Sequence, residues 1–565
     1  MKLRHDPLTL ALSVVLAPAM LASSGPNAMA ASADYSVFQE QRQPATTPKP
    51  ADIPGPPVLQ PASAGPGEAG HNGERGPVFV LNKIRLVGNT VFTENELSAA
   101  YARRIDTNVS YADLLAITDE ITARYRKAGY FLSRAYVPAQ DVVNGEVEVR
   151  VLEGRITQVE FAFKEPILTP LEPFAEAIKS EQPIRLATME RQLLLIAQIG
   201  GIRIDHTTLD ERGEFSGEFS LRVEMTFDRM GMQVSADTAG TRNVGRLQGT
   251  ASLTLNALAN ERGTLNLGVG GVPHDPHEWL YGLVNYQTMV APGLWLGASA
   301  DHGVLHPDGE DRLISANEDY WNAGVNAGYV ALLSRQHLLR FDARFSASNV
   351  DGNNMSGPSK RDRSRVVALS ATAFHTLPHK GTLTAYAEVE RGLNIFGASQ
   401  SGEPLLSRAD AEPDATRLVG RLSWNQPLFG PVSLAMTAAA QATSAPVLSS
   451  REFNLGGTQF GRGYEPGVLT GDSGAAASVE LRYSKDITLG WFRGFQAYGY
   501  YDGGAVWEKG PSGDRTSLAS AGGGLRLFFS EDFKLSAEFG VPLTYSGNAD
   551  GSHPVRANLF MSKSF

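Results

Sequence analysis

Residues 456–467 read GGTQFGRGYEPG, a glycine-dense run that carries a single arginine, Arg462. Glycine reaches backbone conformations that are closed to other residues, so this run predicts a shaped loop and not part of a helix or strand. Further along the chain, Asp502 is the one acid in the strand-like segment YYDGGA at 500–505. An arginine in a loop and an acid on a strand can form an ion pair, and such a pair would hold the loop inside a barrel.

The segments around these two motifs alternate apolar and polar residues. In one of them, Leu339, Phe341 and Phe345 share one face, whereas Arg340 and Arg344 lie on the other. Such two-residue alternation predicts β-strands. A soluble antiparallel sheet alternates as well, but here the polar face carries charges of both signs, as a water-filled lumen permits.

The extent of this alternation favours a membrane barrel over 229–565. Roughly twenty residues for each strand and its connection give about sixteen strands. The chain also ends on an aromatic residue, Phe565, as outer-membrane barrels tend to. Lipid requires every backbone polar group to be paired, which a closed barrel achieves.

Two small modules are predicted ahead of the barrel, at 78–154 and 155–228. In the first, 80–86 is strand-like, a capping box at 93–96 opens one helix and Ser110 opens a second. Strands over 131–137 and 147–152 complete a β-α-α-β-β order. The same order returns in the second module, with strands at 156–163, 202–204 and 219–225 and helices at 171–178 and 188–197. The fold class is therefore a transmembrane β-barrel preceded by two α+β domains.

The N-terminal region predicts export. Residues 1–30 combine a positive start, an apolar stretch at 8–21 and the small-residue site AMA at 28–30, as a signal peptide does. Residues 31–77 are rich in Pro, Ala and Gly and predict a linker. The sequence leaves open whether 35–43 forms a short helix that plugs a pore.

Composition argues against several classes of function. The 565 residues include no cysteine, which excludes disulfides, thiolate metal sites and cysteine nucleophiles. A net charge of −10 gives no reason to expect nucleic acid. His274 and His277 are interpreted as loop surface and not as a metal site, and GASAD at 297–301 fails the serine-hydrolase pattern. We expect no cofactor, no metal and no enzymatic activity.

Taken together, the signal, linker, modules and barrel resemble the outer-membrane transporters of two-partner secretion (TpsB), which secrete haemolysins and filamentous haemagglutinin. The resemblance is carried by the motif Gly461-Arg462-Gly463-Tyr464 and by Asp502-Gly503-Gly504. That family usually has valine where Gly461 stands. It implies that the modules are polypeptide-transport-associated (POTRA) domains and that Arg462, at the tip of the sixth extracellular loop, pairs with Asp502 inside the barrel.

Lumen water is expected to weaken that ion pair. Glu465 and Asp472 are nearby acids that could compete for Arg462. The resemblance further implies a pore in the outer membrane, with periplasmic modules that bind a large exoprotein before it crosses without ATP. Outer-membrane lipid and the barrel-assembly machinery are the other implied partners. A barrel-assembly or membrane-insertion factor and a passive porin remain alternatives, and the cargo and oligomeric state stay open.

Overall fold

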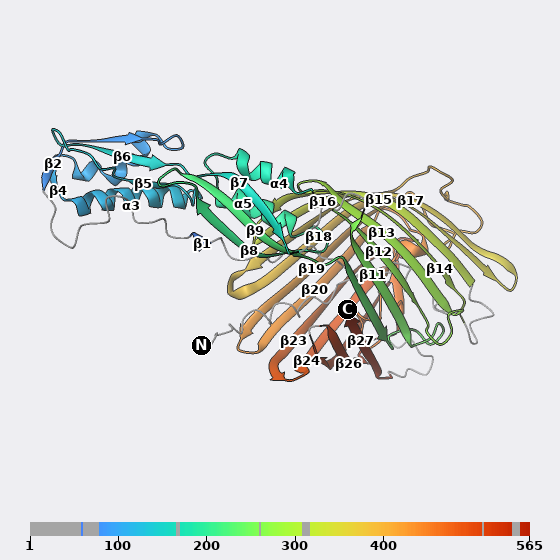
Figure 1. Ribbon diagram of the computed structural model, residues 1–565. Coiled ribbons are helices and arrows are strands. Elements are labelled where there is room, and N and C mark those ends of the chain that lie inside the picture. Colours follow the sequence, from blue (N-terminus) through green and yellow to red (C-terminus); the bar gives the residue numbers. More distant parts are fainter. Residues whose placement is uncertain are drawn as a thin grey trace.

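The computed structural model describes residues 58–59, 78–164, 170–258, 262–307, 317–510, 513–530, 532–544 and 554–565. Two small α+β units follow one another in a row, and the second lies against one end of a large barrel (Figure 1). The predicted signal peptide at 1–30 and the candidate plug helix at 35–43 lie outside the described residues, as does most of the predicted linker. In the described part of the chain, the helices are all too short or too polar to cross a membrane.

The first module packs one long helix on small sheets. Its two helices start at Thr93 and Ser110 as the sequence predicts, and a capping box is present at each start, at Ser110 as well as at the predicted Thr93. The predicted strand at 80–86 is wrong in one respect: it breaks at Asn82, whose N–H donates to Gly145 O (2.8 Å), so that its halves join different sheets. The elements are β2 (Phe79–Leu81), β3 (Lys83–Val87), α2 (Glu94–Leu97), 3₁₀ turns η1 (Ser98–Ala100) and η2 (Ala102–Arg104), β4 (Thr107–Val109), α3 (Tyr111–Lys127), β5 (Arg134–Tyr136) and β6 (Glu146–Leu152).

The second module covers one sheet with two helices. Strands β8 and β9 are longer than the sequence predicted, because their alternation continues to the connecting turn. Val58 and Leu59, far earlier in the chain, pair in parallel with the edge of β8. The elements are β1 (Val58–Leu59), β7 (Arg155–Phe163), α4 (Glu172–Ser180), α5 (Leu186–Ile196), β8 (Ile202–Glu211) and β9 (Glu218–Phe227), with the sheet order β1-β8-β9-β7.

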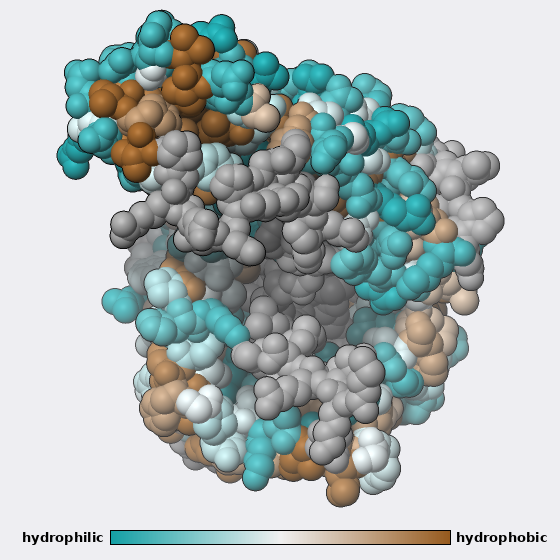
Figure 2. All heavy atoms as spheres, turned by 60° about the vertical axis from the view of Figure 1, so that its left-hand side comes forward, coloured by the Kyte–Doolittle hydropathy of each residue, from teal (hydrophilic) through white to brown (hydrophobic). Residues whose placement is uncertain are grey.

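The barrel closes where its first strand, β10, pairs antiparallel with its last, β27, and its sixteen strands confirm the predicted fold. On the outside, Phe341 and its cross-strand neighbour Tyr329 are 48% and 50% exposed, as residues that face lipid should be. Figure 2 shows hydrophobic residues around the outer rim. The strands are β10 (Met230–Asp237), β11 (Gln248–Leu258), β12 (Gly263–Gly271), β13 (Trp279–Ala291), β14 (Leu294–Leu305), β15 (Asn317–Leu333), β16 (His337–Asn354), β17 (Gly357–Leu377), β18 (Gly381–Gly392), β19 (Thr416–Phe429), β20 (Val432–Thr443), β23 (Ser473–Leu489), β24 (Phe492–Trp507), β25 (Arg515–Phe528), β26 (Phe533–Pro542) and β27 (Arg556–Ser564).

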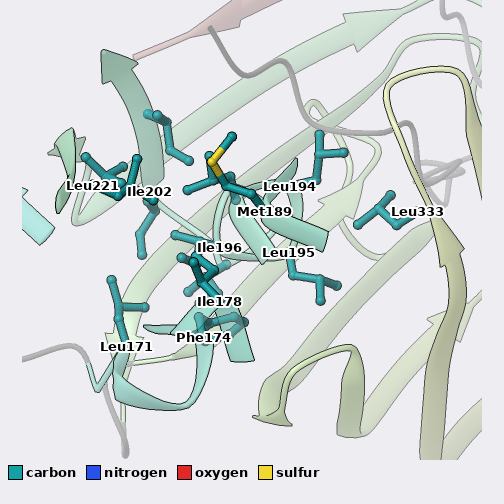
Figure 3. Packing of buried hydrophobic residues seen from close by; sticks show 14 of the residues in the cluster. Leu171, Phe174, Ile178, Met189, Leu194, Leu195, Ile196, Ile202, Leu221 and Leu333 are labelled. Atoms are coloured by element: carbon teal, nitrogen blue, oxygen red, sulfur yellow. The ribbon is translucent and has the colours of Figure 1, made fainter. Parts of the chain in front are cut away.

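The second module and the barrel share a hydrophobic core. Figure 3 shows Leu333 of β15 beside Leu194 and Leu195 of α5. Polar contacts add to this junction: the guanidinium of Arg191 donates to Val330 O (2.6 Å). The barrel residues of the shared core are Met289, Trp295, Val330, Leu333, Leu338 and Phe374, from the ends of β13–β17 nearest the modules.

Candidate functional site

The glycine-rich motif lies in the connection between β20 and β23, residues 444–472, which we call the inner loop because it packs inside the barrel. Its two legs form a short antiparallel pair, β21 (Phe453–Leu455) and β22 (Leu469–Gly471). Apolar side chains of the loop are buried against the inner faces of β20 and β23–β25. The cluster contains Phe453, Leu455, Phe460, Tyr464 and Leu469 of the loop with Ala439, Ala476, Val506 and Leu518 of the wall.

The tip of the inner loop needs glycine at 461. Its φ of 78° is in the left-handed region, which residues with a side chain rarely adopt. A Cβ at this position would lie 2.6 Å from Leu518 Cδ1 and 3.2 Å from Gly456 N. A valine, which the resembling family usually has here, would therefore not fit this backbone, and the departure from the family motif has a local structural reason.

Arg462 extends from the tip to the barrel wall and binds the predicted acid. Its Nε donates to Asp502 Oδ2 (2.9 Å), and its Nη1 donates to Glu538 Oε2 (2.9 Å) and Glu480 Oε2 (3.1 Å). Its guanidinium also lies over the ring of Tyr500, with Cζ 3.3 Å from the ring centroid. The structure thus brings Arg462 and Asp502 together, and adds two acids and an aromatic ring that the sequence analysis missed.

Burial corrects the expectation that lumen water weakens the Arg462–Asp502 pair. Arg462 is 6% exposed and Asp502 is 0% exposed. Removing both charges from water carries a large penalty, which only a well-satisfied network offsets. The network is balanced: Arg482 and Arg526 bind Glu480 (2.6 and 2.8 Å), so that three arginines and three acids meet.

The two nearby acids that could have competed for Arg462 bind other arginines. Asp472 accepts hydrogen bonds from Arg408 instead (2.7 Å for Nη1 to Oδ1). Glu465 lies 3.5 Å from Arg242 and 3.8 Å from Arg556. Both acids are near Arg462 in sequence, but the strand register places Glu480 and Glu538 closer in space.

Backbone contacts fix the rest of the tip. The second oxygen of Asp502, Oδ1, accepts from Gly461 N (3.0 Å) and from the hydroxyl of Ser520. Ser520 Oγ in turn accepts from Gly463 N (3.1 Å). Tyr464 donates its hydroxyl to Ala519 O (3.1 Å), so each residue of the 461–464 motif has a contact on the wall.

The other predicted site residues, Gly503, Gly504 and Phe565, lie on the barrel wall and at its seam. A Cβ at Gly503 would lie 2.6 Å from Leu518 O, and one at Gly504 would lie 2.9 Å from Leu455 Cδ2, so these glycines let neighbouring strands and a loop leg approach closely. Phe565 is 68% exposed, and its N–H donates to Met232 O (2.8 Å) beside the barrel seam.

A second ion cluster, absent from the sequence analysis, ties the stem of the inner loop to neighbouring loops. Arg408, from the connection between β18 and β19, donates to Asp472, Glu452 and Glu508. We call these four residues the outer clasp. Oxygens of its three acids lie within 4.8 Å of one another, a spacing that could suit a metal ion, but the guanidinium of Arg408 already supplies positive charge there. Its four residues come from four separate segments of the chain, so no local sequence motif could have predicted the cluster.

Comparisons with known proteins agree with this architecture. Residues 79–154 match the model of the ShlB-type POTRA domain, and residues 315–527 match that of the haemolysin secretion/activation proteins ShlB/FhaC/HecB. The outer membrane transporter CdiB of Escherichia coli is 24% identical over 96% of this chain and 92% of its own. The heme/hemopexin transporter protein HuxB of Haemophilus influenzae is 20% identical over 85% of this chain and 86% of its own. The solved structure of CdiB from Escherichia coli superposes with a TM-score of 0.71 at 18% identity, covering 87% of this chain and 92% of that one.

A closed barrel with POTRA domains at one end defines a class, the outer-membrane transporters whose N-terminal domains lie in the periplasm. Within that class, the chain belongs to the two-partner secretion transporters (TpsB). This is a family of transporters and not of enzymes. The ends of β13–β17 that carry the second module are accordingly the periplasmic ends.

Proposed function

We propose that the protein recognises one large, unfolded exoprotein of the adhesin or haemolysin type in the periplasm and conducts it to the cell surface without ATP. The observation that supports this most is the inner loop, which a buried ion network holds inside a barrel whose periplasmic end carries the second module. A passive porin has no use for such modules.

The modules offer sheet edges to which an extended cargo can add as a strand. In the second module, the edge of β8 already accepts the extended residues Val58 and Leu59. Main-chain hydrogen bonds at such an edge supply affinity while tolerating varied sequence, which suits capture of an unfolded chain. Folding of the cargo outside the cell would then favour outward movement.

The test is secretion of a candidate cargo, which is to be sought as a very large exported protein encoded beside this gene. We expect wild type to export it and Arg462→Ala to lose export, because three buried acids lose a shared cation. Arg340→Ala is the matched control, since Arg340 pairs with Asp342 on β16. Heat-modifiable gel migration confirms that each barrel is folded.

If Arg462→Ala exports as wild type does, the loop network has no part in transport. If folded wild type exports nothing, the secretion proposal itself fails, and an insertion factor or a porin becomes the better interpretation.

A further inference from the structure

The inner surface of the barrel has two unlike halves. On one half, inward-facing arginines and acids bind one another and the inner loop: Glu390 of β18 binds Arg417 and Arg451 (2.5 Å each) and lies 3.6 Å from Arg344. On the next strand, Asn326 pairs with Arg344 and also faces inward. Successive strands continue this row of inward-facing partners with Gly297, Gln287 and Thr264. These neighbours of Arg344 are all uncharged.

We call the inward-facing residues of β11–β15 the neutral wall. They lie at alternate positions of 250–256, 264–270, 281–287, 297–303 and 320–328, all within the described residues, and are mostly Asn, Gln, Ser, Thr and Gly. Asp301 is the one charged side chain at these positions, and it accepts a hydrogen bond from Asn322 (2.9 Å). The next inward position of β15, towards its extracellular end, is Glu318, which is buried and paired with Lys360 of β17 (2.7 Å).

The neutral wall lies across the lumen from the seat of the inner loop. In the closed strand order, β14 is fifth and β24, which carries Asp502, is thirteenth, so the two are half the barrel apart. The loop packs on β20 and β23–β25. A chain that runs along the neutral wall would therefore be on the opposite face from the ion network.

The periplasmic end of the neutral wall joins the docked module. The core shared between α5 and the barrel includes Met289, Trp295 and Val330, at the ends of β13, β14 and β15. The same core also takes Leu338 and Phe374 from β16 and β17, so the second module borders both halves, and a chain held on it has direct access to the neutral wall.

We propose that the neutral wall is the path along which an extended cargo polypeptide crosses the barrel, which rests on the proposed secretion function. A moving chain of varied sequence presents both signs of charge, and fixed charges on its path would pair with them strongly where water is scarce. Short amides and hydroxyls form only weak, exchangeable hydrogen bonds with any backbone. The charged half is stationary and holds the loop, while the neutral half lets the cargo slide.

The first test is site-specific photo-cross-linking in the full-length transporter. The cargo is stalled in transit by a disulfide-closed loop near its C-terminus. A p-benzoylphenylalanine is placed at Asn266, Asn285 or Ser299 on the neutral wall, or at Ser370 or Ser423, which face inward on the charged half. We expect cargo adducts from the first three positions, and roughly tenfold fewer from the other two, as a preference of about 1.4 kcal/mol would give.

A second measurement places a charge on each half. Ser299→Arg should slow export by roughly tenfold through transient pairing with acids of the cargo. Ser423→Arg should leave export close to wild type, and folding of both is checked by heat-modifiable migration. Equal cross-linking from both halves, or equal export by both variants, would overturn the path. If wild type exports no cargo, the proposed secretion function is wrong, and the proposed cargo path is wrong with it. If wild type exports cargo but the adducts form on the charged half, only the proposed path is wrong.

Discussion

At the scale of single residues, the tip of the inner loop shows how one guanidinium can organise a lumen. Arg462 contacts acids from three different strands, namely Glu480 on β23, Asp502 on β24 and Glu538 on β26. A guanidinium has five N–H donors in a rigid plane, so it can hold several strands in one geometry, which lysine cannot do. The backbone of Gly461 and Gly463 sets the distance at which this side chain meets the wall.

We therefore predict that Gly461→Val prevents the tip from seating. The left-handed backbone alone costs about 1–3 kcal/mol for a residue with a side chain, and the overlap with Leu518 adds to it. Export should fall as far as in Arg462→Ala. Gly402→Val is the matched control, because Gly402 has a similar φ of 81° and nothing within 4 Å of its added Cβ. Export at the wild-type level by Gly461→Val would contradict the steric explanation.

Some of this site was predictable from sequence and some was not. The 461–464 motif and Asp502 are recognisable because each is a compact local pattern. Glu480 and Glu538 carry no such pattern, and their approach to Arg462 depends on the register of strands that lie far apart in the chain. The burial of the network was not predicted for the same reason, since the sequence does not show that side chains of the inner loop pack against the wall around it.

At the scale of elements, the outer clasp joins loops that would otherwise move independently. Arg408 binds Glu452 and Asp472, which flank the two legs of the inner loop, and Glu508 at the end of β24. Glu452 and Asp472 are fully buried. The clasp thus holds the stem of the inner loop at the extracellular end, while Arg462 holds its tip further inside.

The clasp should tighten in mild acid. Burial, together with the nearby carboxylates of Asp472 and Asp410, raises the pKa of Glu508 from 4.5 to about 6 despite Arg408. A raised acid pKa means that the folded loop binds the proton more firmly than the unfolded one. Stability is therefore greatest below about pH 4.5 and falls as pH rises through about 6.

Limited proteolysis of the 508–514 connection in intact barrels provides the measurement. Cleavage should become faster between pH 5 and pH 7 by roughly tenfold, since one pKa unit corresponds to about 1.4 kcal/mol. Glu508→Gln should remove this pH dependence. A pH profile that is the same in the variant and in wild type would show that another group is responsible.

At the scale of the whole molecule, the alternation of residues predicted the barrel and its strand number, and helix periodicity predicted both modules. The junction between them was not predictable, because the core residues of α5 and of the barrel ends look like ordinary interior residues in the sequence. Polar contacts at this junction include Arg335 Nε to Glu190 Oε1 (2.6 Å).

We predict that Arg335→Glu loosens the second module from the barrel and that adding Glu190→Arg restores it. The pair is partly exposed, so its loss should cost about 1 kcal/mol, roughly a fivefold change in the ratio of docked to undocked molecules. The chain has no cysteine, so spin labels can be placed at will on α4 and on the turn at 430–431. A broadened distance distribution in the single variant alone is the expected result, and equal distributions in all three proteins would contradict it.

The shared core also limits how this family can be recombined. Leu132 of the first module belongs to the same apolar cluster as α5 and the barrel residues Met289 and Phe374, so one buried core runs through all three units. A hybrid transporter with only the modules of a relative would place the α5 surface of one protein against the barrel ends of another, and the two surfaces would not be complementary. A graft that changes the cargo should therefore carry the β13–β14 and β15–β16 turns along with the modules. The modules that would select the cargo and the barrel that would conduct it share this core, so the two can be exchanged only together with the residues that join them.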